Sequence, residues 1–435
     1  MEKQQISICW LRRDLRLQDN TALYHALKSA YPVLLVFIFD KIILDQLENK
    51  SDRRVAFIYE TLVDIQNIAR EHESSMLVLY ETPVKAFEKI NALYEIKEIF
   101  LNQDYEPYAI KRDQEIKAFG EKHHMAFHSF KDQVIFERSE IMKPDDTPYT
   151  VFTPYSKIWK NTLSENEIIL YTSERLLSHL VKSKPLDFPS LKDIGFENIK
   201  SEVSKPDIDK ELIAHYSQTR NIPAIKGTSH LGVHLRFGTI SPRNLVKVAL
   251  ENGSSFLNEL IWREFFMMIL YHFPHVVNHP FHKKYEHIKW RNNEKEFEKW
   301  CKGETGFPIV DAGMRQLNET GWMHNRIRMV VGSFLTKDLL IDWLWGEAYF
   351  AEKLLDYELS SNNGNWQWVA GCGCDAAPYF RIFNPDLQTT KFDPDLTYIK
   401  RWVKEYKENY LPPIVDHKEA RTRALDAYKK ATETK

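Results

Sequence analysis

Polar side chains that suit ligand binding share one face of a predicted helix in the second half of this 435-residue chain. Asn325, Arg328, Met329 and Gly332 fall at positions i, i+3, i+4 and i+7, which places them on one side of a helix. The face carries an amide, a guanidinium and a thioether, with a glycine where a bulky group could approach. Such side chains can also serve only neighbouring backbone groups, so both interpretations stay open at this point.

A second polar stretch lies immediately before two tryptophans. Residues 360–365 are Ser-Ser-Asn-Asn-Gly-Asn, a run of turn formers that predicts a turn between two helical segments. Trp366 and Trp368 follow it directly. A polar turn with tryptophans behind it indicates a site for a flat ligand held by amides and aromatic edges.

A carboxylate stands among aromatic residues on the predicted helix Phe256–Phe266. Glu259, Trp262 and Arg263 fall along one side of this helix with its two terminal phenylalanines. Such a carboxylate is either paired with a basic neighbour or kept for a ligand, because burying it alone is costly. An ion pair from Glu259 to Arg263, at i, i+4, is the simpler interpretation.

Two short sequences predict helix starts. Gly227-Thr228-Ser229 has the composition of an N-cap, and Ser241-Pro242 predicts a second start. The free N–H groups of a helix N-terminus can bind a phosphate, although a sequence of this kind is more often a cap alone.

The elements that must hold these residues fall into three predicted parts. Residues 1–130 alternate short β-branched runs with amphipathic stretches, which predicts an α/β domain with a parallel, Rossmann-like five-stranded sheet. Proline-rich residues 131–205 predict a surface connector without long helices, and residues 206–435 predict an all-α domain. The expected strands are Ile6–Trp10, Val33–Phe39, Met76–Tyr80, Glu98–Leu101 and Ala126–Phe130; the expected helices include Thr21–Lys28, Arg53–Glu71, Val84–Tyr94, Tyr108–Lys122 and Phe307–Thr320.

The composition is that of a globular protein without a strong overall charge. Hydrophobic residues make up 43% of the chain and charged residues 28%, and the net charge of -2 means that any nucleic-acid surface must be a local basic patch. The four cysteines are too scattered for a disulfide framework or a zinc site, so no metal is predicted and a reducing cytoplasm is expected. The hydropathy pattern predicts neither a signal peptide nor a membrane span.

Several motifs together resemble those of the photolyase/cryptochrome family. They are L-R-R-D-L-R at residues 11–16, N-E-L-I-W-R-E-F at 258–265, W-M-H-N-R-x-R-M at 322–329 and D-x-x-L-x-x-N-N-G-x-W-Q-W at 356–368. V-F-T-P-Y at 151–155 resembles a further family signature, whose role the residues do not reveal. The resemblance covers nearly the whole chain, is strongest over residues 256–394, and is closest to class I cyclobutane pyrimidine dimer DNA photolyases.

The resemblance implies light-driven DNA repair with a noncovalent FAD. In its reduced anionic form, this FAD would pass one electron to a cyclobutane pyrimidine dimer flipped out of DNA, and the electron would return after the dimer splits. Asn362 would face flavin N5, and Arg328 with Asp356 would form an ion pair beside the isoalloxazine ring. The family's cofactor contacts correspond to Tyr216, Thr228, Ser229, His230, Leu231, Phe256, Glu259, Arg263, Trp322, Asn325, Arg328, Asp356, Glu358 and Asn362.

The same resemblance implies contacts to the lesion and to the DNA backbone. Trp262 and Trp368 would form an apolar wedge against the flipped dimer, and Glu259 would stabilise the dimer radical anion. The family's lesion and DNA contacts correspond to Glu259, Trp262, Asn325, Arg326, Met329, Trp368 and Arg381. Trp366, Trp343 and Trp290 match a three-tryptophan relay that photoreduces oxidised flavin from the protein surface.

The chain departs from the family pattern in two places. Glu358 stands where many relatives carry Asp, which leaves the reach of that carboxylate to the cofactor in doubt. Val276-Val277-Asn278 stands where some folate-binding relatives carry a Cys-Lys pair, so a folate antenna bound in that manner is not supported. Asn102 and Glu106 could still line an antenna cleft, and the identity or presence of a second chromophore is left open.

Three alternatives to dimer repair are weighed on particular residues. His324-Asn325 argues against a six-four photolyase, which usually carries a second His at the Asn325 position. A signalling cryptochrome would be expected to continue into a long C-terminal tail. A nucleotide-handling α/β enzyme with a helical cap is compatible with the composition alone. The favoured reading therefore predicts a monomeric cytoplasmic enzyme that acts on damaged DNA and has no membrane partner.

Overall fold

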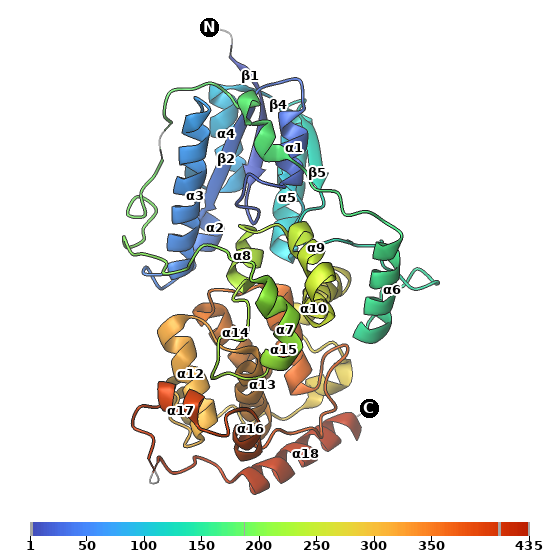
Figure 1. Ribbon diagram of the computed structural model, residues 1–435, viewed down its shortest axis with the longest axis vertical. Coiled ribbons are helices and arrows are strands. Elements are labelled where there is room, and N and C mark those ends of the chain that lie inside the picture. The colour runs from blue at the N-terminus through green and yellow to red at the C-terminus, as the bar shows by residue number, and fades with distance from the viewer. Residues whose placement is uncertain (1–2, 187, 408–409, 434–435) are drawn as a thin grey trace. The chain divides into compact units, whose positions relative to one another are not determined.

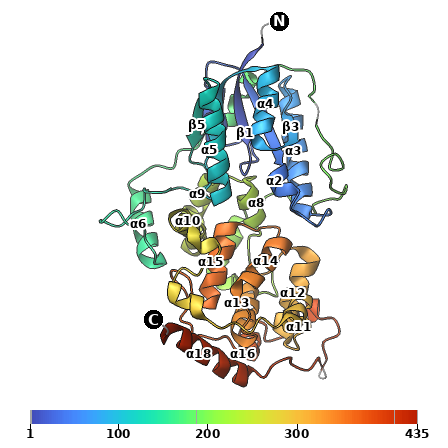
Figure 2. The same cartoon turned by 180° about the vertical axis from the view of Figure 1, so that it is seen from behind.

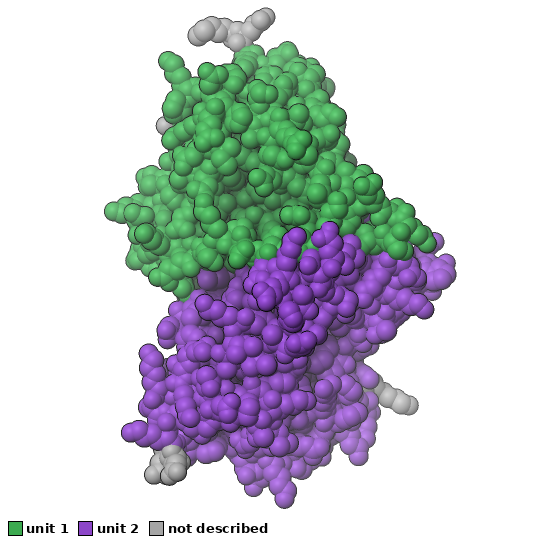
Figure 3. Space-filling model, viewed as in Figure 1, with its two compact units in different colours: residues 1–137, 163–208, 231–248 green, residues 138–162, 209–230, 249–435 purple. Residues whose placement is uncertain are grey.

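The computed structural model describes residues 3–186, 188–407 and 410–433, which form two compact units, coloured separately in Figure 3. Unit 1 comprises residues 1–137, 163–208 and 231–248, and unit 2 comprises residues 138–162, 209–230 and 249–435. The units therefore alternate along the chain, whereas the sequence predicted three consecutive parts. That division into domains stays a prediction, and the last two residues of its third part lie outside the described residues.

Unit 1 is built on a five-stranded parallel sheet of strand order β3-β2-β1-β4-β5, as the sequence predicted (Figure 1). Its central strand β1 pairs on both sides, with Cys9 opposite Leu35 of one neighbour and Phe100 of the other. The central strands are nearly continuous apolar runs, as is usual for a parallel sheet covered on both faces. The strands are β1 (Gln5–Leu11), β2 (Val33–Asp40), β3 (Leu77–Glu81), β4 (Glu95–Asn102) and β5 (Ala126–Phe130).

Helices cover both faces of this sheet, as the two opposite views in Figures 1 and 2 show. One apolar cluster joins α1 (Thr21–Leu27) and α3 (Arg53–Glu71) to one face. A second cluster joins α4 (Pro83–Leu93) and α5 (Pro107–Lys122) to the other face. Successive residues along each strand point to opposite faces of the sheet, so Cys9 and Leu35 belong to the first cluster, and Ile8 and Leu34 belong to the second. Shorter elements are α2 (Lys41–Leu44), α8 (Gly232–Phe237) and the start of α9 (Pro242–Asn252).

The regular elements of unit 2 are all helices within its described residues, which agrees with the predicted all-α character. Its main apolar core contains Trp300, Leu317, Val331, Phe350 and Trp366. The helices are α6 (Phe152–Ser164), α7 (Lys210–Thr219), α10 (Ser254–His272), α11 (Glu294–Lys302), α12 (Pro308–Thr320), α13 (Asn325–Ser333), α14 (Trp343–Lys353), α15 (Leu359–Ala370), α16 (Pro385–Phe392), α17 (Thr397–Trp402) and α18 (His417–Glu433). None of the described helices combines the length and apolar character needed to cross a membrane.

The predicted turn at residues 360–365 is wrong, because this segment lies inside α15. Helix propensity is low here, but tertiary contacts outweigh it. The Gln367 amide donates to the carbonyls of Val276 (2.9 Å) and His279 (3.2 Å). Gly364 packs against the ring of Phe266, which a Cβ on this residue would meet at 2.2 Å. The site residues of this stretch therefore lie on a rigid helix.

Two smaller expectations also differ from the structure. The connector was predicted to lack long helices, yet α6 runs for 13 residues and tolerates Pro154 because that residue lies in its first turn. Thr228 and Ser229 do not cap a helix, since α8 begins only at Gly232 with Leu231 as its N-cap residue. The Ser241-Pro242 start is confirmed, with the Ser241 hydroxyl accepting from the Asn244 amide.

Candidate functional site

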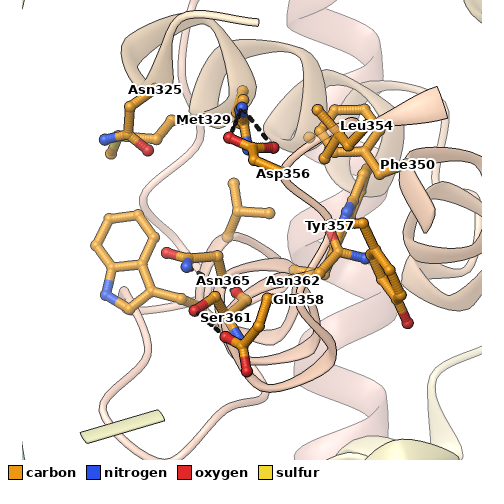
Figure 4. Close-up of a pocket in the computed structure, with 15 residues that line it drawn as sticks. Asn325, Met329, Phe350, Leu354, Asp356, Tyr357, Glu358, Ser361, Asn362 and Asn365 are labelled. Atoms are coloured by element: carbon orange, nitrogen blue, oxygen red, sulfur yellow. Dashed lines mark hydrogen bonds and ion pairs between the residues drawn. The ribbon is translucent and has the colours of Figure 1, made fainter. Parts of the chain in front are cut away.

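A hollow of about 610 Å³, open to solvent, lies between α13, α15 and the segment that joins α14 to α15 (Figure 4). All four residues of the predicted polar helix face line it. The lining comprises Asn325, Arg328, Met329, Gly332, Phe350, Leu354, Asp356, Tyr357, Glu358, Ser361, Asn362, Asn365, Trp366, Trp368 and Val369. We call this space the first hollow.

An ion pair fixes the charge on one wall of the first hollow. The Arg328 Nη2 donates to both carboxylate oxygens of Asp356, at 2.8 and 3.1 Å, and its Nε donates to the Met323 carbonyl at 2.8 Å. The dashed lines at Asp356 in Figure 4 mark this pair. Because three bonds hold the guanidinium, its position is set before any ligand arrives.

The amide of Asn362 is oriented by the half-buried side chain of Glu347. Its Nδ2 donates to the Glu347 Oε1 at 2.8 Å and to the Glu347 carbonyl at 3.1 Å. Burial raises the pKa of Glu347, and the hydrogen bond from Asn362 acts in the opposite direction. Since Glu347 takes the amide hydrogens, the Asn362 Oδ1 is the atom placed to accept a hydrogen bond from a ligand.

The carboxylate of Glu358 caps α15. It accepts from the Ser361 amide at 3.2 Å and from the hydroxyls of Ser360 and Ser361 at 2.7 Å. Glu358 is only 6% exposed, although it lines the first hollow. The longer side chain that stands in place of Asp is therefore occupied in holding the N-terminus of the helix that carries Asn362.

A second hollow, with an empty volume of about 800 Å³, adjoins the first. Five residues line both hollows and form the wall between them, namely Asn325, Met329, Ser361, Asn365 and Trp368. The other lining residues are Arg220, Glu259, Trp262, Arg263 and Phe266. The structure therefore brings Trp262 and Trp368 to one cavity, together with the carboxylate that the sequence singled out.

Glu259 is paired with Arg220 on α7's C-terminal side, 2.5 Å away. Burial raises the pKa of Glu259, and the Arg220 guanidinium opposes that rise. Arg220 also lies over the Tyr216 ring, 5.6 Å from its centroid. The carboxylate thus stays partly exposed at the hollow while a cation holds one of its oxygens.

The two arginines predicted to reach DNA phosphates lie outside the lining of both hollows. Arg326 donates to the Asn221 Oδ1 at 2.8 Å and lies over the Phe392 ring at 4.4 Å. Arg381 is exposed and lies 5.8 Å from the Phe383 ring centroid. Aromatic support of this kind leaves guanidinium N–H groups free to point to solvent.

The three relay tryptophans are placed at two depths. Trp366 is buried, lines the first hollow and contacts Phe350, with ring centroids 5.0 Å apart. Trp343 is also buried, whereas Trp290 is half-buried, and both line a third hollow that opens to solvent. The relay through these three side chains stays a prediction.

Other predicted cofactor contacts form two aromatic pairs that lie outside the lining of both hollows. His230 packs on Trp322, with ring centroids 4.1 Å apart, and Tyr216 meets the Phe256 edge at 5.2 Å. Thr228 and Ser229 are partly buried in the loop that precedes His230. That loop is held to α7, because the Thr219 hydroxyl donates to the Gly227 carbonyl at 3.0 Å. Leu231 is buried in unit 1.

Several residues at the site were not singled out as site residues from the sequence. They include the polar residues Arg220, Glu347, Ser361 and Asn365. Arg220 and Glu347 act through partners 39 and 15 positions away, and sequence spacing does not reveal such pairs. Assigning residues 360–365 to a helix would have revealed Asn365 and Ser361. They lie three and seven positions before Trp368, and this spacing places all three on one helix face.

The two residues considered for an antenna cleft are engaged inside unit 1. The Asn102 amide donates to Asp14 at 2.7 Å and to Asn20 at 2.8 Å, and its Oδ1 accepts from the Ala22 amide. Glu106 is paired with Arg13 at 2.8 Å. These bonds assign both side chains a structural role in the described unit.

Two family models match the chain. One, described as DNA photolyase, matches residues 7–171, and another, described as the FAD binding domain of DNA photolyase, matches residues 256–409. The deoxyribodipyrimidine photo-lyase of Escherichia coli is 35% identical, over 98% of this chain and 99% of that protein. The enzyme of the same name from Alkalihalophilus pseudofirmus is 34% identical, over 97% of both chains.

Solved structures agree with this result. A bacterial class III photolyase from Agrobacterium tumefaciens superposes with a TM-score of 0.86 and 30% identity, covering 100% of this chain and 99% of that one. An archaeal photolyase from Sulfolobus tokodaii, solved with two FAD molecules, gives a TM-score of 0.78 and 31% identity, covering 98% and 100%. These similarities extend over both units.

Proposed function

The chain belongs to the DNA photolyase family, and from this premise we propose which of its residues carry out the repair reaction. The protein is a light-driven carbon–carbon lyase that repairs cyclobutane pyrimidine dimers in DNA with FAD as its cofactor. FAD, when bound, supplies the light absorption and the single electron that this reaction needs. The observation that carries the assignment of residues is the wall that the two hollows share.

The first hollow holds the flavin end of the cofactor. Arg328 and Asp356 form a fixed charge pair there, and the cation can offset negative charge on a reduced ring. Asn362 presents its Oδ1 to accept an N–H, and a neutral amide does not remove the proton. The residues present therefore fit a flat, hydrogen-bonding, anionic ring.

The second hollow holds the flipped dimer. Trp262 and Trp368 offer apolar faces on which a base can stack, and such contacts contribute about 1–3 kcal/mol per base. Glu259 places a carboxyl group at the same cavity, fixed by Arg220, where it can hydrogen-bond the carbonyl groups when protonated or the N–H groups of the lesion. Asn325 and Met329 complete the wall on the cofactor side, while Arg326 and Arg381 contact the DNA phosphates.

Repair itself is tested by illuminating the reduced protein with an oligothymidylate that contains cyclobutane dimers. Thymine absorbance near its usual maximum should recover under light and stay constant in the dark. An oligonucleotide with a six-four photoproduct serves as the matched substrate control and should not be repaired. Recovery with the six-four substrate alone would contradict the assignment of Asn325.

Trp366, Trp343 and Trp290 would pass electrons inward from an external reductant at the surface to an oxidised cofactor. Replacing Trp343 by Phe should slow photoreduction of oxidised flavin, but leave repair intact once the flavin is reduced chemically. Trp345→Phe is the matched control, because Trp345 lies on the same helix and packs on Phe297 instead. Equal photoreduction in Trp343→Phe and the wild type would contradict the relay.

The protein acts on DNA as a cytoplasmic monomer. Its four cysteines are free thiols, which supports a reducing compartment. Light scattering should give the mass of one chain with and without damaged DNA, and a dimer would contradict this part of the proposal. Whether a second chromophore is carried is tested by extracting the purified protein and looking for an absorbing species other than FAD.

A further inference from the structure

The V-F-T-P-Y signature lies at the start of α6 and contacts the proposed lesion cavity through one aromatic pair. The Phe152 ring stacks on Trp262, with centroids 3.7 Å apart and ring planes 5° from parallel. Phe265 meets an edge of the same indole, with centroids 5.6 Å apart and planes at 82°. Trp262 is therefore covered on one face and along one edge.

Phe152 contacts Trp262 but does not itself line the second hollow. Among the described residues that line that hollow, Trp262 and Phe266 are present and Phe152 is not. Phe266 also contacts the indole, with ring centroids 5.4 Å apart and planes at 30°. The indole therefore contacts the Phe152 ring and also borders the cavity, where a stacked base could reach it.

The segment that carries Phe152 is fixed by polar contacts to other parts of unit 2. The Phe152 amide donates to the Asp375 carboxylate at 3.0 Å. Two helical turns further on, the Trp159 Nε1 donates to the buried Glu264 carboxylate at 2.5 Å, and the Lys160 amine donates to Asn258 at 2.7 Å. Glu264 and Asn258 belong to α10, the helix that also carries Trp262. The start of α6 is thus bonded to Asp375, and its later part is bonded to α10, which carries the indole.

We propose that Phe152 is a positioning residue for lesion recognition. It holds the Trp262 indole in the orientation that accepts the flipped dimer. DNA binding then does not lose free energy to ordering this side chain. The proposal rests on the proposed role of Trp262 and deepens it by adding the connector segment to the recognition site. Phe152 itself does not touch the substrate.

The test compares DNA binding by Phe152→Ala with binding by the wild-type holoenzyme. Phe152→Ala should bind a dimer-containing oligonucleotide about threefold to tenfold more weakly, which is the range expected for one aromatic pair. Binding of the same oligonucleotide without a dimer should not change, because phosphate contacts dominate it. FAD content and the photoreduction rate should also match the wild type. An equal loss for damaged and undamaged DNA would overturn the proposal, since it would indicate a general structural effect.

Two further variants keep the test decisive if Phe152→Ala folds poorly. Phe152→Tyr keeps the planar ring and should bind damaged DNA as the wild type does, whereas Phe152→Leu keeps apolar volume without a planar ring and should bind more weakly. Val151→Ala is the matched control, because Val151 is 43% exposed and next to Phe152. Wild-type affinity in Phe152→Leu would overturn the proposal.

Trp262→Ala separates this inference from the proposed function. If Trp262→Ala binds damaged DNA normally, the assignment of the second hollow fails and the inference fails with it. If Trp262→Ala loses lesion affinity while Phe152→Ala and Phe152→Leu do not, only the role of Phe152 is overturned.

Discussion

Charged side chains are buried in both units, but they are used differently. In unit 1, Asp132 is bonded to Arg16 at 2.6 Å and to Arg243 at 2.8 Å, and Arg243 is bonded also to Asp19 at 3.0 Å. In unit 2, the pairs Arg220–Glu259 and Arg328–Asp356 lie along cavity walls and keep part of their surface exposed. A closed network contributes to folding, whereas a pair with an open side can still interact with a ligand.

The pKa values of the two sets of carboxyl groups follow the same distinction. Burial alone would raise the pKa of Asp132, but Arg16 and Arg243 outweigh it and lower the value to about 2. For Glu259 the balance is reversed, since burial raises its pKa more than Arg220 lowers it. One carboxylate is fully committed to its partners, and the other retains a proton affinity that can respond to a substrate.

The contrast between the closed network of unit 1 and the open pairs of unit 2 would fail if Asp132 could be replaced without loss of stability. Asp132→Ala should destabilise unit 1 by about 3–5 kcal/mol, because it leaves Arg16 and Arg243 as buried charges that have lost their shared partner. Thermal unfolding, followed by circular dichroism, should show a clear drop in Tm. Asp193→Ala is the matched control in the same unit, since Asp193 is exposed and should change stability by less than about 1 kcal/mol. Equal shifts in the two variants would contradict the closed network.

Acid should destabilise both units, because each contains a buried histidine. In this respect the two units do not differ. Burial lowers the pKa of His234 in unit 1 and of His324 in unit 2 to about 4. Each imidazole takes up a proton near pH 6.5 when unfolded, so its stabilising contribution is complete above pH about 6.5 and is lost as the pH falls towards 4. The loss should be on the order of 3 kcal/mol for each His.

His324→Asn tests this for unit 2, because Asn can still accept the Arg326 amide that the His324 Nδ1 accepts at 3.1 Å. Unfolding by urea at a series of pH values should show a shallower dependence between pH 6.5 and 4 in His324→Asn than in the wild type. An unchanged dependence would show that this imidazole is protonated equally in the folded and unfolded states.

The open pair in unit 2 should matter for repair more than for stability. Glu259→Ala should lower repair by about tenfold to a hundredfold, the range expected for one hydrogen bond to a charged group, and change stability by less than about 1 kcal/mol. FAD should stay bound. Glu259→Gln keeps a hydrogen-bonding group and should repair better than Glu259→Ala. Unchanged repair in Glu259→Ala would place this carboxylate with the structural pairs instead.

The smallest expected effect is the loss of stability on replacing Glu358, and it tests whether this carboxylate serves the helix or the cofactor. Glu358→Ala removes the cap of α15 and should cost about 0.5–2 kcal/mol, whereas Glu358→Gln keeps an acceptor and should cost less. FAD affinity, measured by flavin fluorescence on dilution, should be close to the wild type in Glu358→Gln. A large loss of FAD affinity in a Glu358→Gln protein of normal stability would instead assign this carboxylate to the cofactor.

The sheet of unit 1 could be predicted because its signals are local. Short apolar runs such as Val33–Phe39 alternate with amphipathic stretches such as Arg53–Glu71, and the observed elements begin and end within a few residues of those expected. The polar face of α13 was predicted for the same reason, since residues seven positions apart, such as Asn325 and Gly332, lie on the same face of a helix. Local periodicity needs no knowledge of the rest of the chain.

The rest depends on contacts between distant segments. Residues 360–365 have turn propensities, yet Gln367 and Gly364 hold them in a helix through Val276, His279 and Phe266. The pairing of Glu259 with Arg220 is likewise a tertiary contact. Propensity is weak compared with such contacts, so α15 and the partner of Glu259 could be found only from the fold.

Because α15 is helical, its register decides which chemistry each residue can serve. Asn362 and Val369 face only the first hollow, while Ser361, Asn365 and Trp368 also border the second. Deleting one residue before Asn362 would turn every later side chain by about 100° around the axis. Amides proposed to bind the coenzyme would then turn away from the first hollow, and no single substitution elsewhere could undo that rotation.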